Sequence, residues 1–312
     1  MPALRSSRPR IVVLGDLMLD VVLAPDRPLE RGTDVPGRVS FVQGGSAANT
    51  ARWLARVGAR PTLISAVGRD AAGRTLVDAV RADRVRARVT RVARARTGRI
   101  GVLVGPGGDR SFVADRGAAD RLDPADLRAS WFARADALHL PFYSLLGDPL
   151  GRAGLRAVEL ARSAGAVVSL DLASIGPLLV GGRRAARARI DAVAPDLLFA
   201  TAAEAEALLG RYAVEGLLEL APAAAVKRGS KGATVLARDG DDRLRFEIAT
   251  PHVVTADTTG AGDAFDAGFL VGWLAARAAG RSSAAALQRG AVAGHRAAAR
   301  QLSTPRPELS IA

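Results

Sequence analysis

The chain has 312 residues, of which 49% are hydrophobic and 24% are charged, and its formal net charge is +13. This composition is typical of a soluble globular protein, and the lack of cysteine excludes disulfides, thiol nucleophiles and thiolate metal sites. The positive charge is almost all arginine, scattered along the chain without interleaved aromatic residues or a nucleic-acid-binding motif. We therefore expect no nucleic acid as a partner, only a general attraction for anionic substrates.

The first residues imitate a secretory signal, with a basic stretch before an apolar one. Asp16 and Asp20 interrupt the apolar stretch, and no convincing small-residue cleavage site follows it. No run reaches the roughly 18 uninterrupted apolar residues of a membrane-spanning helix. We therefore expect a cytoplasmic protein with no membrane partner.

In the first part of the chain, apolar runs and amphipathic segments predict strands and helices in an irregular order. The expected strands are 11–14, 21–23, 38–42 and 61–67, and the expected helices are about 47–57 and 75–83. Residues 99–104 and 110–114, joined by a glycine-rich turn, predict a β-hairpin. The regions of about 20–43 and 98–117 interrupt the alternation of strands and helices with β structure alone, so they can pair into a small sheet lying over an active site.

Beyond that hairpin the chain alternates regularly between strands and helices. The expected strands are 137–140, 167–171, 197–200 and 223–226, with helices at 151–164, 183–190 and 203–209 and a hairpin over 234–248. A further helix begins at about Ala261. Such alternation implies a mostly parallel sheet with helices on both faces.

The start of that last helix predicts an anion site. Gly260, Ala261 and Gly262 form a small-residue helix start, where unpaired N–H groups and the helix dipole favour a phosphate. Asp263 follows one turn into the helix, where a carboxylate can remove the proton of an attacking hydroxyl. The alternative is that Asp263 is an ordinary first-turn acid that complements the dipole.

A second glycine pair, Gly44 and Gly45, precedes the helix at about 47–57. Asn49 offers a donor and an acceptor to a hydroxyl-rich ligand, although it and Ser46 are also good helix caps. Asp16 ends the first strand, where an open α/β sheet places its ligands. Its carboxylate can accept hydrogen bonds from two sugar hydroxyls, or it can be solvated in a loop.

The strings DTTGAGDAF (257–265) and GGSAAN (44–49) resemble the two signatures of the ribokinase-like (PfkB-type) carbohydrate kinases. The resemblance implies one kinase domain over residues 10–300, with terminal extensions at 1–9 and 301–312. It implies a three-layer α/β/α fold with a mostly parallel central sheet and a β lid from about 20–43 and 98–117. It also implies a small-molecule sugar substrate, a general base at Asp263 and an anion hole at 260–262. The expected sugar contacts come from five residues: Asp16, Gly44, Gly45, Asn49 and Asp263 itself.

The resemblance implies ATP as the phosphoryl donor, together with Mg²⁺. The loop VKRGSKG (226–232) resembles the family's nucleotide loop, although a simple β-turn would have the same composition. The expected nucleotide contacts are Thr201, Lys227, Gly229, Ser230, Gly232 and Gly262. Glu204 is expected to hold Mg²⁺ through water or, alternatively, to be an ordinary first-turn charge of a helix. Thr201 and Asp266 depart from the family, which usually has Asn at both positions.

The resemblance further suggests K⁺ bound by the Asp257 side chain and the Thr259 backbone, and a homodimer formed through the lid. The sequence thus predicts an ATP-dependent kinase that phosphorylates a primary hydroxyl of a small sugar or sugar derivative. Two alternatives remain open, a nucleoside kinase of the same superfamily and a non-catalytic sensor of sugars or nucleotides. The intact Asp263 and its glycines argue against a sensor.

Overall fold

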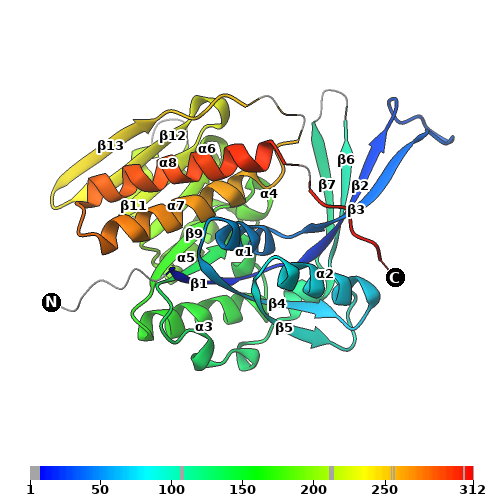
Figure 1. Cartoon of the computed structure of the whole chain (residues 1–312), viewed down its shortest axis with the longest axis horizontal. Helices are drawn as coiled ribbons and strands as arrows, with labels where there is room; N and C mark the ends of the chain where they lie inside the picture. The colour runs from blue at the N-terminus through cyan, green and yellow to red at the C-terminus, as the bar shows by residue number, and fades with distance from the viewer. Residues whose placement is uncertain are drawn as a thin grey trace.

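The computed structural model describes residues 8–105, 109–210, 214–253, 255, 257–304 and 306–311. Its larger sheet has nine strands in the order β13-β12-β11-β10-β9-β8-β1-β4-β5 (Figure 1). These strands are β1 (Arg10–Leu14), β4 (Arg60–Gly68), β5 (Arg86–Val92), β8 (Ala137–Pro141), β9 (Val167–Asp171), β10 (Leu197–Thr201), β11 (Ala223–Lys227), β12 (Ala233–Asp239) and β13 (Asp242–Ile248). All pairings are parallel except those of β12 with β11 and β13.

Helices cover both faces of this sheet, as the regular alternation predicts. One face carries α1 (Ser46–Arg56), α2 (Ala71–Ala82), α7 (Ala261–Ala278) and α8 (Ser283–Leu302). The other carries α3 (Leu150–Ser163), α4 (Ile175–Leu178), α5 (Gly182–Val193) and α6 (Ala202–Leu209). Short 3₁₀ helices lie at Gly117–Arg121, Pro124–Asp126, Ala129–Trp131, Phe142–Leu145, Val214–Glu219 and Gly229–Lys231. The two cores are therefore separated by a sheet that is buried on both sides.

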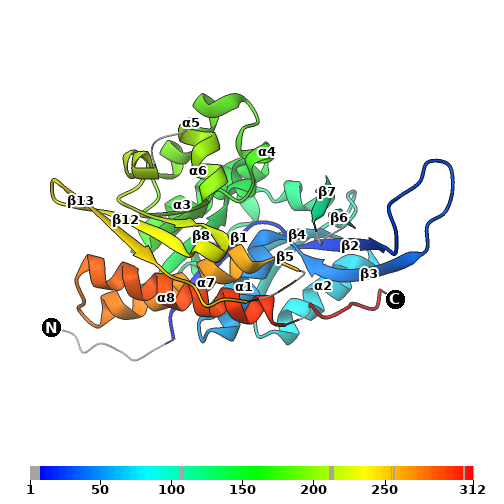
Figure 2. The same cartoon turned by 90° about the horizontal axis from the view of Figure 1, so that it is seen from above.

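The smaller sheet has four strands in the order β3-β2-β6-β7. They are β2 (Met18–Pro25), β3 (Gly37–Gly44), β6 (Arg99–Val104) and β7 (Arg110–Asp115). Figures 1 and 2 show this sheet projecting from one end of the molecule, apart from the larger sheet. Large apolar side chains stay exposed on it, with Phe112 at 58% and Val113 at 78%. The two regions that interrupt the predicted alternation thus form one sheet, here called the lid.

The last described residues of the chain lie along the lid. Glu308 makes an isolated antiparallel bridge with Val42 of β3, and the Leu309 amide donates to the Phe41 carbonyl at 2.7 Å. Leu309 and Ile311 also pack against the core that contains α1 and α7. The segment set apart by its sequence as a terminal extension therefore joins the lid to the body.

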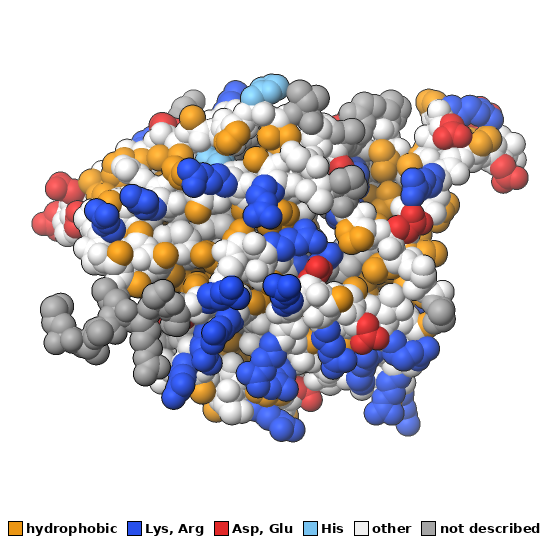
Figure 3. Space-filling view, viewed as in Figure 1, with side chains coloured by type: hydrophobic (Ala, Val, Ile, Leu, Met, Phe, Trp, Pro, Cys, Tyr) orange, Lys and Arg blue, Asp and Glu red, His pale blue; other side chains and the backbone are white. Residues whose placement is uncertain are grey.

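The structure confirms the predicted fold class, and among the elements that the sequence did not predict are a strand and a long helix. Residues 86–92, three of which are arginine, form β5 at the edge of the large sheet. Helix α8 has no predicted counterpart, although its Ala-rich residues pack along α7. Figure 3 shows lysine and arginine side chains spread over several elements of one face, as expected for a dispersed charge. Among the described residues, no helix has the length and apolar character needed to cross a membrane.

Candidate active site

Two cavities meet at the carboxyl ends of the central strands. The first, of about 680 Å³, lies between the body and the lid and is lined by Asp16, Asn49, Asp263 and lid residues of β7. The second, of about 950 Å³, lies beside the loop 229–232 and the first turn of α7. Thr201, Lys227 and Gly262 line both cavities. A group bound in one cavity can therefore reach a group bound in the other.

Asp263 lies in the first turn of α7 and faces the first cavity. Its Oδ1 accepts a hydrogen bond of 2.7 Å from the Ser46 hydroxyl, and its Oδ2 accepts one of 2.9 Å from Asn49 Nδ2. Burial raises the pKa of Asp263 to about 7, although both hydrogen bonds act to lower it. The carboxyl group is therefore poised to change its charge near neutral pH.

Ser46 and Asn49 do not cap α1, because the helix start has no side-chain cap. The Asn49 oxygen accepts a hydrogen bond of 3.1 Å from Gln43 Nε2, which fixes the orientation of its amide group. Both side chains are thus turned toward Asp263 by the helix start. The capping interpretation of these two residues is wrong.

The glycine pair before α1 allows two close approaches. A Cβ on Gly44 would overlap the Asp20 carboxylate, and a Cβ on Gly45 would lie 2.5 Å from the Asp16 carbonyl oxygen. Gly45 also has φ of 94°, which side chains with a Cβ rarely adopt. The turn therefore brings α1 directly against the end of β1, where Asp16 lies.

Asp16 is 2% exposed and is held from two sides. Its Oδ1 accepts the Ala47 amide at 3.1 Å, and its Oδ2 lies 3.3 Å from a guanidinium nitrogen of Arg116. Arg116 itself follows β7, pairs with Asp120 and stacks over the ring of Tyr143 at 5.1 Å. A residue from the end of the lid thus closes onto the carboxylate that is expected to bind the sugar.

The start of α7, which is expected to bind an anion, leaves two amides for a ligand within the described chain in place of the expected three. Gly260 is the N-cap with φ of 77°, a left-handed conformation that suits glycine. The Ala261 amide is already used, since it donates to the Thr258 carbonyl at 3.1 Å. No such partner engages the amides of Gly260 and Gly262 within the described chain.

Lys227 lies at the junction of the two cavities, at the end of β11. Its Nζ contacts Asp171 at 3.0 Å and both oxygens of Asp266, at 3.1 and 3.2 Å. Burial alone would lower the pKa of Lys227, but these two carboxylates and Glu204 raise it above its usual range. Burial and Asp171 raise the pKa of Asp266. The family's usual Asn at 266 is therefore replaced by an acid whose charge Lys227 neutralises.

Thr201 and Glu204 form a capping box at the start of α6. The Thr201 hydroxyl accepts the Glu204 amide at 3.2 Å, and Glu204 Oε2 accepts the Thr201 amide at 2.8 Å. Glu204 thus lies in the first turn of a helix, as the alternative interpretation of this residue predicts. Among the described residues, no group of three or more His, Cys, Asp or Glu side chains is arranged to bind a metal directly.

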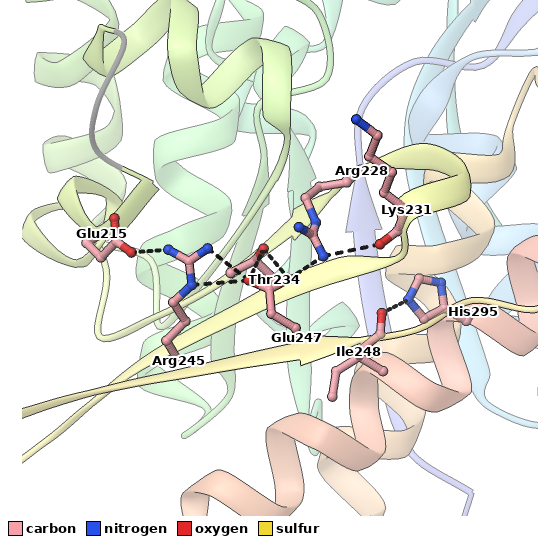
Figure 4. A network of polar contacts seen from close by, with 8 residues as sticks. All are labelled: Glu215, Arg228, Lys231, Thr234, Arg245, Glu247, Ile248 and His295. Carbon is pink, nitrogen blue, oxygen red and sulfur yellow. Dashed lines mark hydrogen bonds and ion pairs between the residues drawn. The ribbon is translucent and has the colours of Figure 1, made fainter.

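The second cavity is lined by both polar and apolar residues. Gly229, Ser230 and Gly232 line it near Lys227, whereas Val253, Ala298 and Leu302 are among the apolar residues that line it elsewhere. Figure 4 shows polar contacts around the β12–β13 hairpin, and three of the residues in it, Arg228, Lys231 and His295, also line the second cavity. Arg228 donates to the Lys231 carbonyl at 3.1 Å and pairs with Glu247, and His295 contacts the Ile248 carbonyl at 3.2 Å.

Asp257 and Thr259, the residues expected to bind K⁺, lie just before the anion site. Thr259 donates its amide to Asp257 Oδ1 at 2.8 Å and accepts at its carbonyl from Gln301 Nε2 at 3.1 Å. Asp257 Oδ2 lies 3.0 Å from Arg110 and 3.9 Å from Arg306. Donors of the protein therefore already engage both groups.

The family model for "pfkB family carbohydrate kinase" matches residues 8–308. The chain belongs to this family. Fructokinase-1 of Oryza sativa subsp. japonica is 31% identical over 268 residues, which cover 82% of this chain and 80% of that protein. Membership in the pfkB family and similarity to fructokinases identify the chain as a sugar kinase, which is a phosphotransferase.

Solved structures show that the fold of this pfkB kinase is ribokinase-like. An adenosine kinase from Sinorhizobium meliloti superposes with a TM-score of 0.81 at 24% identity, covering 96% of each chain. An E. coli chain solved in complex with ATP and Mg²⁺ superposes with a TM-score of 0.77 at 22% identity, covering 96% of this chain and 94% of that one.

Several residues of this pfkB kinase site were missed from the sequence. Ser46 was interpreted only as a cap, and Arg116 and Asp171 had no predicted role. No local pattern marks Arg116, because its contact with Asp16 spans 100 residues. Asp171 could have been found, since it ends a predicted strand at the same sheet edge as Asp16.

Proposed function

We propose that this sugar kinase transfers the γ-phosphoryl group of ATP to a primary hydroxyl of a small sugar or sugar derivative. The observation that carries the proposal is the position of Asp263, beside Gly262, where the two cavities meet. The sugar occupies the cavity under the lid and the nucleotide occupies the other. The hydroxyl then lies between the carboxylate and the phosphoryl group.

In this proposal Asp263 is the general base. With a pKa of about 7, its carboxylate is available near neutral pH and is basic enough to take the hydroxyl proton as the bond to phosphorus forms. The amides of Gly260 and Gly262 and the dipole of α7 stabilise the charge on the transferred group. Ser46 and Asn49 hold the carboxylate in place throughout.

The sugar is held by Asp16, Asn49 and the turn at Gly44 and Gly45. Asp16 has accepting capacity left after its contacts with Ala47 and Arg116, because a carboxylate accepts about four hydrogen bonds. The lid covers this cavity with residues of β7. Its closure would exclude water, which would otherwise compete with the sugar for the phosphoryl group.

The nucleotide lies along Gly229, Ser230 and Gly232. Its base lies toward the apolar lining residues of the second cavity, which include Val253, Ala298 and Leu302. Lys227 and Thr201 face its phosphates. Mg²⁺ enters with the nucleotide and neutralises phosphate charge, and Glu204 holds it through water. The E. coli chain of the same fold, solved with ATP and Mg²⁺, supports this donor. K⁺ is not part of the proposal, because protein donors engage Asp257 and Thr259.

A second candidate is a nucleoside kinase, favoured by the superposition with the S. meliloti adenosine kinase. A sensor without activity is disfavoured by the pKa of Asp263, since a ligand-binding site has no need of a base that titrates near pH 7.

Coupled assays with MgATP and separate panels of pentoses, hexoses, sugar acids and nucleosides test the proposal. We expect turnover with a sugar, and the Asp263→Asn variant serves as the inactive control. Turnover with nucleosides alone supports the second candidate. Binding of a sugar without turnover in any panel would contradict a kinase role.

A further inference from the structure

The peptide unit between Thr259 and Gly260 lies at the entrance of the anion site, where both residues line the sugar cavity. In a planar trans peptide the carbonyl oxygen and the amide hydrogen point in opposite directions. A group that fixes the Thr259 carbonyl therefore also aims the Gly260 amide. That amide is one of the two left for the transferred phosphoryl group.

Gln301 of α8 fixes this carbonyl. Its Nε2 donates to the Thr259 oxygen at 3.1 Å, and its Oε1 accepts from the indole nitrogen of Trp53 at 2.8 Å. An indole nitrogen only donates, so Trp53 determines which end of the Gln301 amide is the oxygen and leaves the nitrogen for Thr259. Gln301 is 8% exposed and therefore held in this arrangement.

Arg306 supplies positive charge next to Asp257, two residues before Thr259. Its Nε lies 3.9 Å from Asp257 Oδ2, and its NH1 lies 2.7 Å from Asp20 Oδ2 in the lid. The Arg306 side chain is 10% exposed, so water screens these charges weakly. Arg110 of β7 adds a second guanidinium 3.0 Å from Asp257.

These residues do not fit a bound monovalent cation. A hard cation needs oxygen lone pairs, and N–H donors of the protein already occupy part of those on the Thr259 carbonyl and on both Asp257 oxygens. A cation at Asp257 would also lie beside the guanidinium groups of Arg110 and Arg306, and like charges at such distances repel.

We propose that the guanidinium of Arg306 and the amide of Gln301 take the place of a monovalent cation behind the anion hole, so that phosphoryl transfer by this chain does not need K⁺. This rests on the proposed function. Arg306 provides the fixed positive charge, and Gln301 orients the peptide that carries the Gly260 amide. Both are positioning residues, because they act through Asp257 and Thr259.

The wild-type protein provides the first test. Phosphoryl transfer is measured in potassium, sodium and tetramethylammonium chloride at equal ionic strength, and binding of a non-hydrolysable ATP analogue with Mg²⁺ is measured by calorimetry in the same salts. We expect rates and affinities that agree within about twofold. A tenfold or greater gain with K⁺ in either quantity overturns the proposal. If no sugar is phosphorylated, the proposed function is wrong. The calorimetry then still shows whether K⁺ affects binding of the ATP analogue.

Variants provide the second test, with Arg296→Ala as a control that removes an exposed arginine of α8. Gln301→Leu and Arg306→Ala should each lower kcat about 10- to 100-fold and leave the sugar KM within about twofold. Arg306→Lys should retain most of the rate, and millimolar guanidinium or K⁺ should restore part of it to Arg306→Ala. If Arg306→Ala does not fold, Gln301→Leu and the wild-type salt series decide. A wild-type kcat in Gln301→Leu overturns the proposal.

Discussion

The Ser46 hydroxyl donates a hydrogen bond of 2.7 Å to Asp263 Oδ1, although the two residues lie 217 positions apart in the sequence. Ser46 begins α1 and Asp263 lies in the first turn of α7, and the two helices pack on the same face of the sheet. The hydrogen bond stabilises the charged form of the carboxyl group and so acts to lower its pKa. Ser46 and Asn49, which belong to the motif that is expected to bind the sugar, therefore lower the pKa of Asp263.

Ser46→Ala should move the acidic limb of the pH–rate profile to higher pH. We expect this limb near pH 7 in the wild type, because burial raises the pKa of Asp263 to about 7 and the group must lose its proton before it can act as a base. Removal of the Ser46 hydrogen bond raises the pKa of Asp263 further. Profiles of kcat/KM against pH for the two proteins measure the difference. An unchanged limb, or one at lower pH, would mean that Asp263 is not the group that titrates.

Asp263→Asn should lower turnover by about 10²–10⁴, the usual cost of losing a general base. It should also stabilise the fold at neutral and alkaline pH. Burial raises the folded-state pKa of Asp263 from 3.8 to about 7, so wild-type stability falls as pH rises through this interval and stays low above it. Asparagine does not ionise, so the variant does not lose this stability as pH rises. Thermal unfolding from pH 4 to 8 should show a growing difference that levels off near pH 7, and turnover within about threefold of wild type would exclude Asp263 as the base.

Asp16→Ala should weaken sugar binding by about 1.5–3 kcal/mol, the range for hydrogen bonds to a charged group. Nucleotide affinity should stay constant, because Asp16 lines the proposed sugar cavity but not the proposed nucleotide cavity. Calorimetry with each ligand separates these effects. The role assigned to Asp16 is wrong if ATP affinity falls while sugar affinity is unchanged.

Lys227→Met should destabilise the fold by about 3–5 kcal/mol, since it leaves the buried carboxylates of Asp171 and Asp266 without their cation. Adding Asp266→Asn to this variant should recover part of the loss, because it removes one of the uncompensated charges. Chemical denaturation of the wild type, both single variants and the double variant measures the coupling. Additive effects would show that the Lys227–Asp266 contact has no energetic role.

Sugar binding should order the lid. Phe112 and Val113 expose large apolar surfaces on β7, and this strand also lines the sugar cavity through Arg110 and Ser111. Amide exchange in β6 and β7 should slow when sugar is added, and any homodimer should bury this surface. Protection that changes only around residues 44–49 would mean that the segment 98–117 is not a substrate lid.

Much of this architecture is readable from local pattern. Strand β9 has the predicted bounds, α7 begins at the predicted Ala261, and the two regions of the lid are those that interrupt the alternation. The edge strand β5 was missed because three of its seven residues are arginine and its apolar residues are only half-buried, which weakens the alternating signal.

The site was only partly readable, for a physical reason. Sequence motifs identify side chains that lie close to one another along the chain, such as Gly44 and Asn49. Pairings such as Lys227 with Asp266 arise from tertiary packing, and the sequence shows only that Asp266 departs from the family pattern. The contact between Asp266 and the Lys227 ammonium explains the acid at position 266.

The contact between the lid and the end of the chain bears on how the enzyme is made in the cell. Asp20 lies in β2 and pairs with Arg306, 286 residues later. At about 5–20 residues per second, a ribosome needs on the order of 15–60 s to bridge that interval. During this time β2 and β3 are already synthesised, while the residues that anchor them and the base at Asp263 do not yet exist. A nascent chain therefore cannot complete this contact until Arg306 has been synthesised, and a chain truncated before that residue would have an unanchored lid.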